Sequence, residues 1–156
     1  MAKEMNKVKK HGAHFRIGIA TCVLLVLAVI AYTIGAAYYG YYSDMNPVIL
    51  IFATISVVLC MSVAFLMDKK GDSVILRLMS LVVTILPTFC LMMLATARVY
   101  SIAVLMLSDL ERDNVMGYYA LYFSIGAMGL FLIAAVCNAI SNFIKPYDSE
   151  SKEILN

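Results

Sequence analysis

The hydrophobic residues of this chain are concentrated in four long runs that lack charged side chains almost entirely. The runs cover about 17–39, 47–67, 78–107 and 117–144. A hydrocarbon core of about 30 Å requires roughly 20 apolar residues in a helix, so each run is long enough to cross a membrane. Because every backbone N–H and C=O group in lipid needs a partner within the protein, helices are favoured over irregular segments. The pattern therefore predicts an all-α integral membrane protein whose four spans form a transmembrane bundle.

The third run is the longest, since only Arg77 and Arg98 interrupt the apolar stretch from Val74 to Leu107. As one helix it would be about 51 Å long at roughly 1.5 Å per residue, so it must either tilt and project or break. Pro87 removes one backbone hydrogen bond and predicts a kink. We expect the part after Arg98, residues 99–107, to form a separate apolar element at the outer interface.

Composition supports a membrane location and excludes several classes of protein. Of the 156 residues, 63% are hydrophobic and 14% are charged, and the mean hydropathy is +0.89. Soluble domains carry about 45–50% apolar and about 25% charged residues. A net charge of +2 without a basic face cannot neutralise many phosphates, which argues against nucleic-acid binding. We find no linker or repeat, so residues 1–156 are expected to form a single four-span domain.

The distribution of Lys and Arg predicts the sidedness of the chain. Ten of the 12 cations lie in the flank 1–16, the second loop and the tail 145–156. Cytoplasmic flanks collect Lys and Arg, so we expect both termini in the cytoplasm and a multi-pass location in a plasma (inner) membrane. The hydrophobic core of a signal peptide has about 7–15 residues. Because the first run is longer than that, we expect the first span to remain uncleaved.

Small residues recur four positions apart in three of the runs. Helices in lipid associate through small residues that allow close approach, so these positions predict packing faces within the chain or toward another subunit. The faces comprise Ala31 and Gly35, then Ser56, Cys60 and Ala64, and finally Ala120, Ser124, Ala135 and Ala139.

The sequence offers no pattern for a metal site or a thiol redox centre. The four cysteines fall one per run without a C-x-x-C spacing, and both histidines lie in the basic flank. Paired ligands are needed for either chemistry. We therefore expect buried, unpaired thiols, no bound metal and no cofactor.

A polar stripe follows one side of the third run. At about 100° per residue, Ser80, Thr84, Thr88 and Arg98 fall within an arc of roughly 100°. One interpretation is the wall of a hydrated path or pocket, with Arg98 contacting an anion or carboxylate. The other is helix packing, in which the hydroxyl groups bond the backbone and Arg98 reaches the outer headgroups.

Tyrosine is concentrated at the outer boundary, where eight of the ten tyrosines lie. A tyrosine offers a flat apolar face and a hydroxyl, so the cluster predicts either a docking surface or an interfacial anchor. At the inner end of the fourth run, Asn138 and Asn142 are expected to hydrogen-bond a neighbouring helix or a partner subunit. The candidate ligand- or partner-binding residues are Arg98, Tyr100, Asp44, Tyr118, Tyr119, Tyr122 and Glu111.

The four runs contain no Asp, Glu or His, which argues against an enzyme and against a proton-coupled transporter. The sequence therefore predicts a noncatalytic accessory or scaffold subunit of a larger membrane assembly, such as a transporter. The alternative is a small homo-oligomeric channel or facilitator whose path is lined by Ser80, Thr84, Thr88 and Arg98. The expected partners are the lipid bilayer and other membrane subunits or further copies of the chain.

Overall fold

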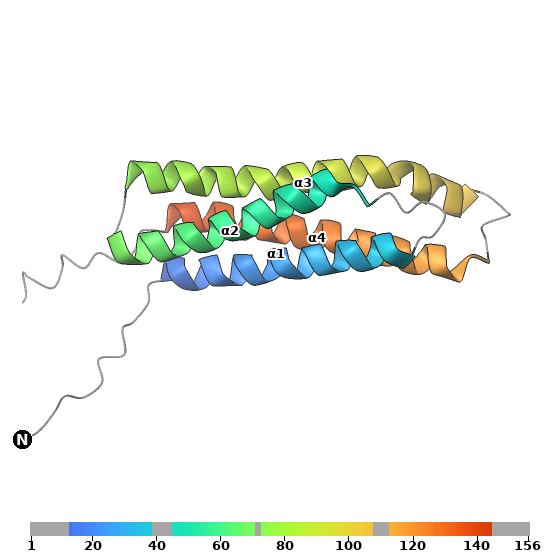
Figure 1. The fold of residues 1–156 in the computed structure, drawn as a ribbon, viewed down its shortest axis with the longest axis horizontal. Helices are drawn as coiled ribbons and strands as arrows, with labels where there is room; N and C mark the ends of the chain where they lie inside the picture. The colour runs from blue at the N-terminus through green and yellow to red at the C-terminus, as the bar shows by residue number, and fades with distance from the viewer. Residues whose placement is uncertain (1–12, 39–44, 71–72, 108–112, 145–156) are drawn as a thin grey trace, which may run out of the picture.

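The computed structural model of the chain describes residues 13–38, 45–70, 73–107 and 113–144. These residues form four long helices, α1 (Ala13–Tyr38), α2 (Pro47–Lys70), α3 (Val74–Leu107) and α4 (Val115–Phe143). The helices lie side by side in an up-and-down arrangement (Figure 1). Each is long and apolar enough to cross a membrane. The expected all-helical bundle of four candidate membrane spans is confirmed.

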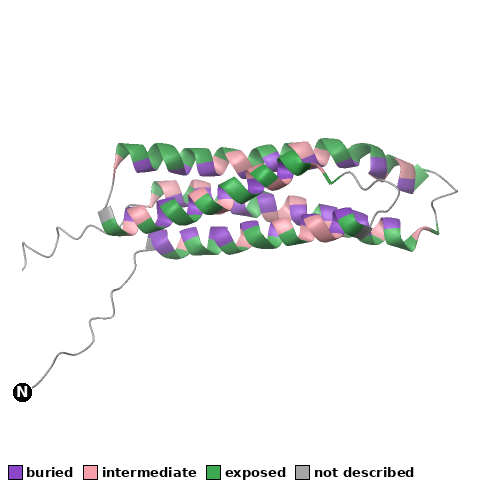
Figure 2. Cartoon of the chain, viewed as in Figure 1, coloured by how far each residue is buried: buried purple, intermediate pink, exposed green. Residues whose placement is uncertain are grey.

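The helices pack in a ring in which α1 and α3 each contact both α2 and α4. In each helix, buried residues lie mainly on the side that faces the other helices, and exposed residues lie mainly on the opposite side (Figure 2). The centre holds Leu25, Val83 and Phe131, all of which are fully buried. Between 28% and 39% of the residues in the most apolar stretch of each helix are buried, so most apolar side chains face outward. Such a surface suits a lipid environment rather than water.

The expected break after Arg98 is wrong, because α3 continues as one helix from Val74 to Leu107. Its last turns have a partner: Leu105 is buried against Ala120 and Leu121 of α4. The ends of α3 and α4 extend together past the ends of α1 and α2 (Figure 1). Residues 99–107 therefore pack on α4 instead of forming a separate element. The kink expected at Pro87 stays a prediction.

Three of the helices also extend beyond the expected runs, at the start of α1 and α3 and at the end of α2, where they include the exposed cations Arg16, Lys69 and Arg77. The sequence runs were bounded by charge, whereas a helix can continue into the hydrated headgroup region without loss of backbone hydrogen bonds. The charged residues therefore occupy the first and last turns of the helices and do not end them.

The start of α2 is attached to α1 through a buried tyrosine. Asn46 accepts a hydrogen bond from the Val48 N–H through its Oδ1 atom at 3.0 Å, which caps the helix. Pro47 follows as the first helical residue, where its missing N–H costs nothing. The Asn46 N–H donates to the Tyr32 hydroxyl of α1 at 2.9 Å. Tyr32 thus has a structural role that its position in the first run did not reveal.

Two glycines of α1 mark its closest approaches to its neighbours. A Cβ atom placed on Gly18 would lie 2.8 Å from the Cβ of Ala64 in α2. One placed on Gly35 would lie 3.3 Å from both the Ala120 carbonyl oxygen and the Ser124 Oγ of α4. Small-residue positions predicted separately in the sequence therefore meet one another in the bundle. Such contacts are the usual means of close helix packing in lipid.

We expect Gly18→Ala to destabilise the bundle by about 1 kcal/mol or more, since overpacking costs roughly 1–3 kcal/mol and helix propensity returns part of it. The measurement is thermal unfolding in detergent, followed with a thiol-reactive dye that reports exposure of the buried cysteines. Gly126→Ala is the matched control, because nothing lies within 4 Å of the added Cβ. A lower midpoint for Gly126→Ala than for Gly18→Ala would contradict this packing.

Candidate functional site

Arg98 lies on the buried face of α3, which comprises Leu76, Ser80, Val83, Pro87, Cys90, Leu94, Arg98, Ser101 and Leu105. It follows the exposed Arg77 by 21 residues, about 31 Å at roughly 1.5 Å per residue. That distance is close to the hydrocarbon thickness, so Arg98 is at the outer boundary if Arg77 is at the inner one. Only 5% of Arg98 is exposed, so its side chain does not extend over the surface toward the headgroups.

A small cavity adjoins Arg98 between the C-terminal end of α3 and the N-terminal end of α4. Its volume is about 10 Å³, and its small size follows from the close contact of the two helices. The lining residues are Arg98, Ser101 and Leu105 from α3 and Gly117, Ala120, Leu121 and Ser124 from α4. The Ser124 hydroxyl donates to the Ala120 carbonyl oxygen at 2.8 Å, so its hydrogen is already used.

Arg98 is an energetically demanding residue at this position. Within the described ranges, its guanidinium forms neither an ion pair nor a hydrogen bond. A charge that is buried between helices normally has an ion-pair or hydrogen-bond partner, because an unpartnered buried charge is costly. Of the candidates predicted from the sequence, Arg98 is therefore the one whose surroundings most need an explanation.

A second group of polar residues joins the N-terminal part of α3 to the C-terminal part of α4. The Asn138 Nδ2 atom donates to the Ser80 carbonyl oxygen at 2.9 Å and to the Thr84 hydroxyl at 2.8 Å. The Ser80 hydroxyl donates to the Asn142 Oδ1 atom, and the Asn142 Nδ2 atom is 3.5 Å from the Thr84 hydroxyl. We call these four residues the amide–hydroxyl cluster. Its members satisfy one another, as buried polar groups in lipid must.

The candidate path-lining residues do not form one continuous polar wall. Ser80 is buried and Thr84 half-buried, and both belong to the amide–hydroxyl cluster. Thr88 is exposed and donates to the Thr84 carbonyl oxygen at 3.0 Å. Much of the polar stripe therefore has partners within the same chain, as in the helix-packing interpretation.

The tyrosine candidates separate from Arg98. Tyr100, Tyr119 and Tyr122 are exposed at the same end of the bundle, whereas Arg98 is buried between the helices. Tyr118 is half-buried, and its hydroxyl lies 3.5 Å from the Leu105 carbonyl oxygen. Asp44 and Glu111 lie outside the described residues. Tyr100, Tyr119 and Tyr122 are therefore exposed individually, whereas Arg98 is not exposed beside them.

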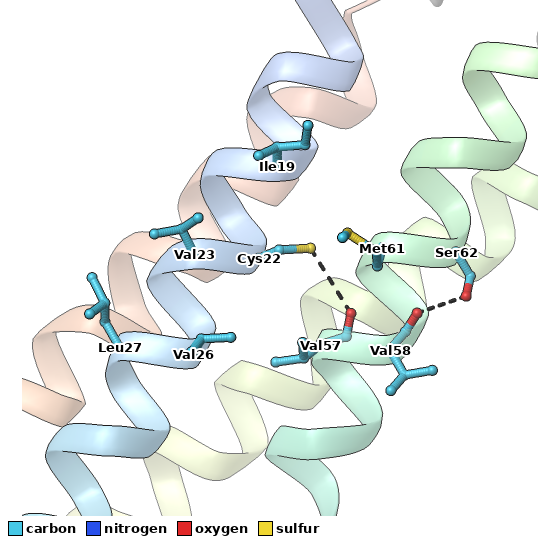
Figure 3. Close-up of a pocket in the computed structure, with 9 residues that line it drawn as sticks. All are labelled: Ile19, Cys22, Val23, Val26, Leu27, Val57, Val58, Met61 and Ser62. Carbon is cyan, nitrogen blue, oxygen red and sulfur yellow. Dashed lines mark hydrogen bonds between the residues drawn. The ribbon is translucent and has the colours of Figure 1, made fainter.

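A second and larger cavity, away from the residues proposed as site candidates, was not predicted from the sequence. It is a groove of about 530 Å³ between α1 and α2. Figure 3 shows the lining side chains Ile19, Cys22, Val23, Val26 and Leu27 of α1 and Val57, Val58, Met61 and Ser62 of α2. The Ser62 hydroxyl donates to the Val58 carbonyl oxygen at 2.8 Å, so even this polar residue has its hydrogen bond within α2. The groove is thus an apolar surface at the middle of both helices.

The cysteines are all free thiols, and three of the four are buried. Cys22 and Cys60 contact each other across α1 and α2, next to the Gly18 crossing. The Cys60 thiol also lies 3.5 Å from the Gly18 carbonyl oxygen. Among the residues with a described placement, no three His, Cys, Asp or Glu side chains are grouped as metal ligands would be. The Cys22 and Cys60 thiols therefore lie in the packing of α1 on α2.

No family model, curated protein or solved structure matches the chain. Its function is therefore interpreted from its own geometry. Three features of that geometry are candidates for chemistry or recognition: the Arg98 cavity, the groove between α1 and α2, and the exposed tyrosines. Only the groove is large enough to receive part of another macromolecule or a lipid chain.

We expect Asn138→Ala to lower the free energy of unfolding by about 0.5–2 kcal/mol, because it leaves buried partners on α3 unsatisfied. Thr84→Val should cost less, and the double variant should show a coupling energy of about 0.5–1.5 kcal/mol for the direct Asn138–Thr84 bond. Detergent denaturation of all three variants gives these values.

Thr96→Val is the matched control for this cycle. Thr96 is exposed and bonds only the Met92 carbonyl oxygen of its own helix, at 2.8 Å. We expect no coupling between Thr96→Val and Asn138→Ala. Equal coupling for Thr84 and Thr96 would contradict the interhelical bond.

Proposed function

We propose that the chain is a noncatalytic accessory or scaffold subunit of a larger membrane assembly, such as a transporter. The observation that carries this proposal is the apolar groove between α1 and α2. The exposed tyrosines at the outer end provide a second contact surface for the same assembly. The protein itself supplies shape and contacts, and chemistry or transport is the work of its partner.

The position and lining of the groove suit a transmembrane helix of another subunit. Residues 19–27 of α1 and 57–62 of α2 are central in their helices, so the groove lies at membrane depth. Helices in lipid gain stability from van der Waals contact when side chains of one fill a depression in another. A partner helix with protruding aliphatic side chains would gain more contact here than on a smooth helix face.

The tyrosine surface suits recognition near the outer headgroups. Tyr100 and Tyr122 are each 66% exposed, and Tyr119 is 52% exposed. Aromatic side chains at such positions combine a large apolar contact area with a hydroxyl that remains hydrogen-bonded at the interface. An external loop or domain of the partner would reach these side chains while its helix occupies the groove.

The proposed orientation places both termini in the cytoplasm and the protein in a plasma (inner) membrane. The exposed Arg16, Lys69 and Arg77 lie at one end of the bundle, which supports this orientation because cytoplasmic ends collect cations. The tyrosine surface then faces the outside of the cell.

The alternative is a homo-oligomeric channel or facilitator. That function would require the polar side chains of α3 to face a path formed between copies of the chain. Ser80 and Arg98 instead lie on the face of α3 that is buried within one copy. We therefore prefer the accessory subunit, and the experiment below separates the two.

The test places a photoreactive phenylalanine derivative in the full chain, either in the groove or on a distant lipid-facing position. The groove position is Val58, which is 58% exposed, and the control is Ile85 of α3, which is 64% exposed. We expect irradiation of native membranes to join position 58, but not 85, to one larger protein in fixed stoichiometry. Val23→Trp, which fills the groove, should reduce the yield several-fold.

The other outcomes contradict the proposal in different ways. Cross-linking of position 58 to a second copy of the chain would support the homo-oligomeric alternative. Equal cross-linking at positions 58 and 85, or cross-linking to lipid alone, would remove the groove as a docking site.

A further inference from the structure

We propose that Arg98 and Ser101 bind a single small monovalent anion, of the size of chloride, in the cavity between the outer ends of α3 and α4. This inference does not depend on the proposed partner, because the residues involved face α4 and not the groove. It gives Arg98, the buried cation of α3, a role in binding an anion within one chain.

The first argument is the unbalanced charge. Only 5% of Arg98 is exposed. A guanidinium in a protein is permanently protonated and carries five N–H donors. Across the described parts of the chain, no carboxylate contacts it. A charge held out of water requires an opposite charge and hydrogen-bond acceptors close by. A bound anion supplies both.

The second argument is a hydroxyl donor at the same cavity. Ser101 is only 7% exposed, and within the residues that the structure places, its hydroxyl has no hydrogen-bond partner. Ser124 differs, because its hydroxyl hydrogen is directed to the Ala120 carbonyl oxygen. Arg98 and Ser101 are thus two largely buried residues that line one cavity, and their donors have no partner among the described residues. An acceptor between them would satisfy both.

The size of the cavity determines the class of anion. A volume of about 10 Å³ corresponds to about one water-sized sphere. A monatomic anion is the anion nearest to this size, whereas sulfate, phosphate and organic carboxylates are larger still. Leu105 and Leu121 form the apolar part of the lining and add to this restriction.

The position of the cavity allows exchange with the outer solution. Arg98 precedes the end of α3 by nine residues, about 13 Å at roughly 1.5 Å per residue. At this end α3 and α4 extend beyond the other two helices (Figure 1). A small ion therefore has a short route from solution, and once bound it links the ends of α3 and α4.

The test measures thermal unfolding of the purified full chain in detergent while chloride replaces gluconate at constant ionic strength. We expect a saturable rise of the midpoint with chloride and bromide and none with sulfate. An anion that binds only the folded state shifts the unfolding equilibrium about 100-fold at 100 times its Kd. Equilibrium dialysis with radioactive chloride should give about one ion per chain.

Three variants locate the site. Arg98→Gln should abolish the chloride effect, and Ser101→Ala, which retains the charge, should weaken chloride binding several-fold. Arg16→Gln, at an exposed position near the opposite end, should leave it unchanged. Ser101→Ala and the anion series on the unmodified chain remain decisive even if Arg98→Gln does not fold.

Several results would overturn the inference. No difference between chloride and gluconate would mean that water or a carboxylate of the chain satisfies Arg98. An equal rise with sulfate would indicate general screening of charge. Full chloride dependence in Arg98→Gln or Ser101→Ala would place any bound anion elsewhere.

Discussion

The close approach of α1 to its two neighbours is the contact on which the rest of the bundle depends. In lipid, apolar burial adds little attraction between helices, so stability comes from backbones that can pack closely. Gly18 permits this contact with Ala64 of α2, and Gly35 permits it with Ala120 of α4. With α1 fixed at both places, the remaining surfaces of α1 and α2 form the apolar groove near the middle of both helices.

The two sides of the bundle are held together by different kinds of contact. The α1–α2 side is held by small residues and thiols, whereas α3 and α4 are joined by the amide–hydroxyl cluster of Ser80, Thr84, Asn138 and Asn142. Most hydroxyl groups on α3 are thereby satisfied within the chain. Near the C-terminal end of α3, the Arg98 guanidinium and the Ser101 hydroxyl have no such partner among the described residues, and both residues line the small cavity against α4.

The sequence was sufficient for the four helices and the single bundle because hydrophobic run length alone defines a membrane span. The four-residue spacing also identified Gly35, Ala64 and Ser124 as packing residues, but it could not show which faces meet. The continuation of α3 to Leu107 depends on the matching length of α4, which run length in one helix cannot show. The burial of Arg98 and the groove arise from the relative placement of helices, so neither leaves a local pattern in the sequence.

The central claim is that the chain is a subunit of a membrane assembly that contains a different, larger protein. Native mass spectrometry of the complex extracted directly from its own membrane in lipid nanodiscs tests this claim most directly. The account predicts a species whose mass contains this chain and a distinct larger membrane protein in fixed stoichiometry. A species with the mass of the chain alone, or of a closed ring of identical copies, would contradict it.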